Sequence, residues 1–116
     1  MTARRQEVNR TAALADLRRY YPPAATEAGW LRQVQDLASI LGWRTYHPYL
    51  SIRSTRGWPD LALVRPPRYI LAELKRDGGK LTRAQVEWIE LLRQCPGIEV
   101  YVWFPRDLAA IAVVLR

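Results

Sequence analysis

The chain has 116 residues, of which 49% are hydrophobic and 25% are charged, a composition typical of one folded domain and not of a disordered chain. No apolar run approaches the ~20 residues of a membrane span, which excludes a transmembrane helix, and the first ten residues lack an apolar signal-peptide core. The single cysteine and single histidine exclude an internal disulfide and a closed Cys/His zinc site. Lys and Arg outnumber Asp and Glu by 18 to 11, and the net charge of +7 favours a polyanionic partner, nucleic acid first. We expect a basic, cytoplasmic protein without a membrane association.

Residues 1–25 are interpreted as a basic N-terminal extension, with a short helix over 4–20 that ends before Pro22 and Pro23. The organised domain is predicted to span 26–116. Its first element is an amphipathic helix over 27–41, because apolar residues recur there at three- and four-residue steps. Thr26 is the expected N-cap and Gly42 the expected C-terminal stop.

The next elements are predicted to be strands. An aromatic strand is expected over 43–50, interrupted at Pro48, and a polar loop over 51–58. Two apolar runs over 60–64 and 69–75 predict a β-hairpin, whose Pro66-Pro67 centre favours a loop wider than two residues.

A second helix over 82–94, a strand over 98–104 and a short helix over 106–112 complete the chain. The order is helix, strand, strand, strand, helix, strand. It predicts an α/β fold in which a mixed sheet is flanked by helices.

Two acids in the hairpin carry the first chemical signal. If the hairpin is centred between Pro66 and Pro67, Asp60 lies opposite Glu73 on the neighbouring strand. Opposed carboxylates destabilise a sheet unless a cation lies between them, and Mg²⁺ binds in this way through one or two protein carboxylates. A register shifted by one residue would instead place the two acids on opposite faces, and the spacing leaves both alternatives open.

Lys75 shares a face of its strand with Glu73, because strand side chains repeat every two residues. A lysine beside a carboxylate-bound metal can orient a water molecule or stabilise charge on a phosphate. The alternative is a surface Glu–Lys pair, although the apolar neighbours Ile70, Leu71 and Leu74 indicate a central strand.

Two further polar residues have two interpretations each. Glu27 extends the apolar stripe of the first helix, so it either reaches the same site or complements the helix dipole. Gln85 completes a capping box with Thr82, yet it also shares a face with Trp88 and Ile89, directed at the sheet. The pattern alone favours the capping role for Gln85.

These residues together resemble a family. Their order is similar to that of the motifs of the virus-type replication-repair nucleases, the VRR-NUC branch of the PD-(D/E)XK superfamily. The motifs are, in chain order, Glu27, Gly57-Trp58-Pro59-Asp60, Glu73-Leu74-Lys75, and Gly79-Lys80-Leu81-Thr82 before Gln85. The similarity covers residues 26–107. It implies an αβββαβ core and a Mg²⁺- or Mn²⁺-dependent DNA endonuclease. Metal binding falls to Glu27, Asp60, Glu73 and the backbone carbonyl of Leu74, and the catalytic residues are Asp60, Glu73, Lys75 and Gln85, with Lys75 positioning the water.

The resemblance also implies partners and a setting. Stand-alone members are phage-encoded, dimeric and structure-specific for branched DNA such as Holliday junctions, which places the chain in a bacterial or phage-infected cytoplasm, in DNA repair or recombination. Basic and polar residues near the motifs are candidates to hold the DNA backbone: Arg53, Ser54, Arg56, Arg76, Lys80 and Arg83. Trp58 is expected to pack in the core rather than stack on a base, and His47 to be structural. The competing functions are a DNA-binding module that does not cleave and a basic domain that binds a membrane surface or another protein.

Overall fold

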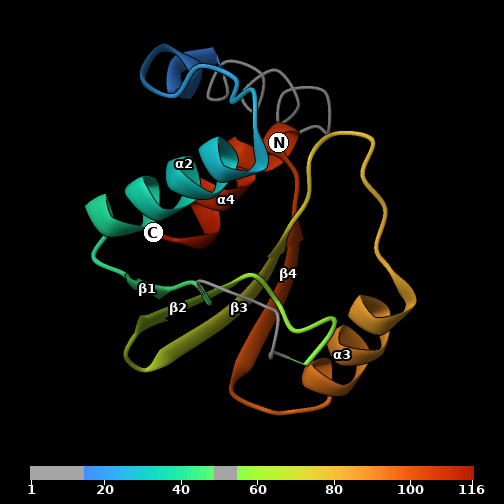
Figure 1. The fold of residues 1–116 in the computed structure, drawn as a ribbon. Coiled ribbons are helices and arrows are strands. Elements are labelled where there is room, and N and C mark those ends of the chain that lie inside the picture. Colours follow the sequence, from blue (N-terminus) through green and yellow to red (C-terminus); the bar gives the residue numbers. More distant parts are fainter. Residues whose placement is uncertain (1–14, 49–54) are drawn as a thin grey trace, which may run out of the picture.

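The computed structural model describes residues 15–48 and 55–116 of the chain, and these residues form a mixed α/β fold (Figure 1). Residues 15–20 are helical. The further elements, in chain order, are α2 (Glu27–Ile40), β1 (Arg44–Tyr46), β2 (Leu61–Arg65), β3 (Arg68–Leu74), α3 (Arg83–Arg93), β4 (Ile98–Trp103), the 3-10 turn η1 (Pro105–Asp107) and α4 (Leu108–Val114). The predicted element order is confirmed, as is an α/β fold in which a mixed sheet is flanked by helices.

Within the described residues the strands form one four-stranded sheet in the order β1-β2-β3-β4. Neighbours β1, β2 and β3 are antiparallel, whereas β4 runs parallel to β3, with α3 as the connection between them. Leu61 pairs with Ala72 and Arg65 with Arg68, which is the register expected for a hairpin centred between Pro66 and Pro67. The prediction of a wider loop is wrong, because Pro66 and Pro67 alone connect the strands through a cis peptide bond, the geometry of a type VI turn.

The two faces of the sheet are covered differently. Helices α2 and α4 cover one face, and α3 lies on the other (Figure 1). The main core lies on the α2–α4 side, where alternate residues of β2 and β3 point inward. It consists of Trp30, Val34, Leu37, Ala38, Trp43, Leu61, Leu63, Ile70, Ala72, Trp103, Leu108, Ile111 and Leu115. Within the described residues, a smaller group on the α3 side contains the buried side chains of Leu71, Ile89 and Leu92.

The helix ends follow the sequence signals closely. The Thr26 side chain accepts a hydrogen bond from the Gly29 N–H and caps α2, and Gly42 follows the helix with a φ of +87°. The strand expected over 43–50 is shorter than predicted, since β1 ends at Tyr46 before Pro48, which has no N–H for a ladder; positions 49 and 50 lie outside the described residues. The last helix extends to Val114, two residues beyond its predicted end.

The hairpin turn holds the C-terminal residues in place. The guanidinium groups of Arg65 and Arg68 lie 4.6 and 4.9 Å from the ring centroid of Trp43, whose Nε1–H donates to the Leu115 carbonyl at 2.8 Å. Arg68 also forms a two-point ion pair with Glu99, at 2.7 and 2.8 Å. These contacts fix one end of the sheet, and the candidate site lies at the other end. None of the described helices is both long and apolar enough to cross a membrane.

Candidate functional site

The predicted acid pair meets at the start of β2. The hairpin register runs to Leu61 and Ala72, and Asp60 and Glu73 are the next residues beyond this pair. The Asp60 Oδ2 accepts a hydrogen bond of 2.9 Å from the Leu74 N–H, and the Asp60 side chain lies within hydrogen-bonding reach of Glu73. The alternative register, which would separate the two acids, is therefore wrong.

Glu73 is a buried carboxyl group in an unusual environment. Its side chain is only 2% exposed, and its Oε1 accepts a 2.9 Å hydrogen bond from Gln85 Nε2. Its Oε2 is buried and finds no hydrogen-bond donor among the described residues. Burial is the main reason that the pKa of Glu73 rises from 4.5 to about 8; Asp60 raises this pKa further and the positive charge of Lys75 lowers it. The fold therefore favours the protonated form of Glu73.

Gln85 performs both roles that the sequence left open. Its Oε1 accepts a hydrogen bond from the Thr82 N–H at 2.8 Å while the Thr82 hydroxyl accepts from the Gln85 N–H at 3.2 Å, which completes a capping box. Its Nε2 donates to Glu73 at the same time. The two ends of one amide thus connect the first turn of α3 to the buried carboxyl group.

The segment before Asp60 is docked onto α3. Gly57 has a φ of +89°, and a Cβ atom at this position would lie 2.4 Å from the Ala84 carbonyl carbon. The Trp88 Nε1–H donates to the Arg56 carbonyl at 3.0 Å, and the Trp58 and Trp88 rings meet edge to face with 5.0 Å between centroids. The Gly57-Trp58-Pro59 segment therefore holds Asp60 at a fixed distance from α3.

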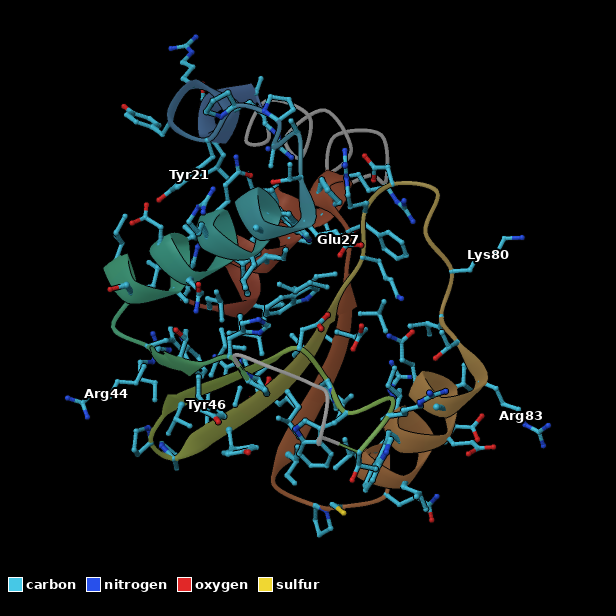
Figure 2. All side chains as sticks on the ribbon, viewed as in Figure 1. Tyr21, Glu27, Arg44, Tyr46, Lys80 and Arg83 are labelled. Carbon is cyan, nitrogen blue, oxygen red and sulfur yellow. The ribbon has the colours of Figure 1, made fainter. Side chains whose placement is uncertain are left out.

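A cavity of about 230 Å³ opens on the α2 side of Asp60. Glu27, from the first turn of α2, and His47, just after β1, line it together with Asp60 and Lys75. Figure 2 shows Glu27 beside the end of the sheet where this cavity lies. Leu74 and Arg76 also line the cavity, so the Glu73-Leu74-Lys75 motif borders it directly.

His47 is the residue whose contact the sequence did not reveal. Its Nδ1 lies 2.7 Å from the Asp60 carbonyl oxygen, which can only accept, so Nδ1 carries the proton. This bond ties the end of β1 to the start of β2, in agreement with the structural role expected for His47. The β1–β2 register would have revealed the contact, because it places residue 47 opposite Leu61, but the register is not visible in the sequence.

The predicted metal ligands are only partly assembled. The structure brings Asp60 and Glu73 together, and Glu27 lines the same cavity as Asp60. Glu73 instead accepts a hydrogen bond from Gln85 of α3. In the described ranges no group of three or more His, Cys, Asp or Glu side chains is arranged to hold a metal ion. The site thus has two adjacent carboxyl groups and a third acid across the cavity.

The predicted DNA-contacting residues have different settings. Arg53 and Ser54 lie outside the described residues. Arg56, Lys80 and Arg83 are exposed, and Figure 2 shows that Lys80 and Arg83 point away from the body of the protein. Arg83 pairs with Glu87 at 3.2 Å on the surface of α3.

Arg76 is exposed as well, but it borders the cavity, and its Nη1 donates to the Ala25 carbonyl at 2.7 Å. This bond connects the segment after β3 to the residues just before α2. Arg76 is therefore a predicted phosphate contact that borders the same cavity as Asp60.

In comparisons with known proteins, no family model, curated protein or solved structure matches the chain.

Proposed function

We propose that the protein is a divalent-metal-dependent DNA endonuclease with a PD-(D/E)XK core of the VRR-NUC type, which hydrolyses phosphodiester bonds in branched DNA as a homodimer. The observation that carries this proposal is the buried Glu73 beside Asp60, with a Glu73 Oε2 that finds no partner among the described residues. A buried polar atom without a partner is costly, and such an atom beside a second acid makes the position a candidate functional site. The net charge of +7 supports a DNA substrate.

The donor set fits Mg²⁺ or Mn²⁺. Both ions prefer oxygen ligands, and the carboxyl groups of Asp60 and Glu73 are hard oxygen donors at one point of the fold. The backbone carbonyl of Leu74 and the Glu27 carboxylate would complete the set from the motif and from the cavity wall. When bound, the cation supplies positive charge that offsets the repulsion of the two acids and the charge that grows on a scissile phosphate.

The remaining residues have distinct tasks in this proposal. Lys75 lines the cavity and would orient the attacking water toward phosphorus. Gln85 keeps the Glu73 side chain in place through its 2.9 Å bond. Attack by water forms one new P–O bond and breaks the bond to the 3′ oxygen, which leaves with a proton, so the products carry 5′-phosphate and 3′-hydroxyl ends.

The test is a cleavage panel with end-labelled four-way junction, flap and linear duplex DNA, each with Mg²⁺, Mn²⁺ or EDTA. Wild-type protein is expected to cut the branched substrates only with a divalent ion, and Lys75→Ala to bind them without cutting. Arg93→Ala, which removes an exposed guanidinium from the last turn of α3, is a matched control expected to retain cleavage. Binding without cleavage by the wild type under every metal would favour the alternative, a DNA-binding module that does not cleave, and would overturn the nuclease proposal.

A further inference from the structure

The described residues cover one face of the sheet unevenly next to the acid pair. Helix α3 contacts β4 and, through Gln85, Glu73 of β3, and Leu71 is buried on this face, whereas the β1–β2 part carries exposed side chains. The register places Tyr46 beside Ala62 and Leu71 in one row across this face, and Arg44 beside Val64 and Tyr69 in the next row. Tyr46 is 69% exposed, and Val64 and Tyr69 are each 37% exposed.

These open rows border a shallow groove of about 500 Å³. Tyr46, Ala62, Val64 and Pro66 form much of its wall, and Arg44 and Arg65 also line it. Of the described residues, no acidic one lines this groove. Figure 2 shows Tyr46 lying over the β1–β2 part of the sheet and Arg44 extending beyond its outer edge. The surface therefore combines a flat aromatic ring, small apolar side chains and an exposed positive charge.

The groove lies near the acid pair along the hairpin. Asp60 and Glu73 come directly after the last register pair, Leu61 and Ala72, and each is two residues along the chain from Ala62 or Leu71. Two residues of a strand span about 7 Å, which is close to the distance between neighbouring phosphates of a DNA strand. Tyr46 pairs with Ala62, so a DNA strand with a phosphate near Asp60 would have a neighbouring nucleotide near Tyr46.

We propose that the Tyr46 groove binds an unpaired nucleobase of the DNA substrate, with Tyr46 as the stacking surface and Arg44 as a contact for a neighbouring phosphate. This inference rests on the proposed DNA substrate. A tyrosine ring offers every base the same π-face, so stacking on it does not select one base. Base faces are hidden inside paired duplex, so the groove favours DNA with unpaired bases, such as branch points, gaps and frayed ends.

The test measures binding in EDTA, where cleavage is blocked. The probes are a gapped oligonucleotide duplex with 2-aminopurine in the gap and a fully paired blunt duplex of the same length. Tyr46→Ala is expected to weaken binding of the gapped probe roughly tenfold, the usual effect of losing one aromatic stacking partner, and to abolish the change in 2-aminopurine fluorescence. Binding of the paired duplex should change less than twofold. Tyr46→Phe, which keeps the ring, should behave like the wild type.

Tyr20→Ala is the matched control. Tyr20 is 80% exposed in the helical segment that lies on the far side of α2 from the sheet (Figure 1), so its loss should leave both affinities unchanged. An equal loss of gapped and paired binding in Tyr46→Ala, or no loss at all, would overturn the inference. So would sedimentation that shows Tyr46→Ala converting a dimer to a monomer, because the groove would then be an interface between copies. Tyr46-dependent base binding without cleavage under any metal would refute only the proposed hydrolysis.

Discussion

The pH dependence of stability should reveal the buried acid pair, and Glu73→Gln isolates it. The amide of glutamine imitates the protonated carboxyl group: it can still accept from Gln85 and can donate to Asp60. In wild-type protein the folded state holds a proton on Glu73 that the unfolded chain releases above about pH 4.5, so stability falls as the pH rises from there through about 8. Glu73→Gln removes this fall.

The size of the effect follows from the shifted pKa. One pKa unit corresponds to about 1.4 kcal/mol, so a rise from 4.5 to about 8 gives an upper bound on the order of 5 kcal/mol for the cost of ionising Glu73 in the fold. Asp60 carries part of this cost, and water entry relieves part, so we expect Glu73→Gln to be about 2–3 kcal/mol more stable than wild type at pH 9. At pH 5 the two proteins should be nearly equal in stability.

The assay is urea unfolding in metal-free buffer at pH 5, 7 and 9, followed by circular dichroism. Glu90→Gln, which removes an exposed acid from α3, controls for the loss of one negative charge and should shift stability equally at all three pH values. A Glu73→Gln difference that is the same at pH 5 and pH 9 would refute the reasoning, as would a wild type more stable at pH 9 than the variant.

Three further predictions concern the surroundings of the pair. Gly57→Ala should lower the free energy of unfolding in urea by about 2–4 kcal/mol, because the new methyl group meets the Ala84 carbonyl at a φ of +89°. Gly78→Ala, at a similar φ in open space, should lower it by only about 1 kcal/mol. Equal losses would contradict the docking of the Gly57 segment on α3. Gln85→Glu keeps the capping pattern but places a third carboxylate against Glu73, so its loss of stability should grow between pH 5 and pH 9. Thr82→Ala, which removes the cap, should lose about 1 kcal/mol of stability at every pH. The same pH profile for both variants would contradict the Gln85–Glu73 contact. Mg²⁺ at a hundred times its Kd should stabilise the wild type by about 2.7 kcal/mol in thermal unfolding and Glu73→Gln by far less; equal stabilisation would place the ion elsewhere.

The hairpin and its acids could be predicted from the sequence because local patterns determine them. Alternation around Pro66-Pro67 defined the register, and the register alone brings Asp60 opposite Glu73. The helix caps at Thr26 and Thr82 were visible for the same reason, since a cap depends on three or four consecutive residues.

Contacts between distant segments could not be predicted in this way. The bond from His47 to the Asp60 carbonyl and the docking of Gly57 on Ala84 depend on how β1 and α3 are placed against the hairpin. The double role of Gln85 was visible only as two alternatives, because the sequence does not show how close Glu73 lies to the start of α3. The exposure of Tyr46 on the sheet likewise depends on where α3 lies, which is against β4 and Glu73 of β3.

The most direct test of the account is the single-turnover rate at which the wild type and Glu73→Gln cut a labelled four-way junction as Mg²⁺ is titrated. The account predicts a wild-type rate that rises with Mg²⁺ to a plateau and vanishes in EDTA, and a Glu73→Gln rate at least about a hundredfold lower with DNA binding retained. Cleavage by Glu73→Gln at the wild-type rate, or no Mg²⁺-dependent cleavage by the wild type, would contradict it.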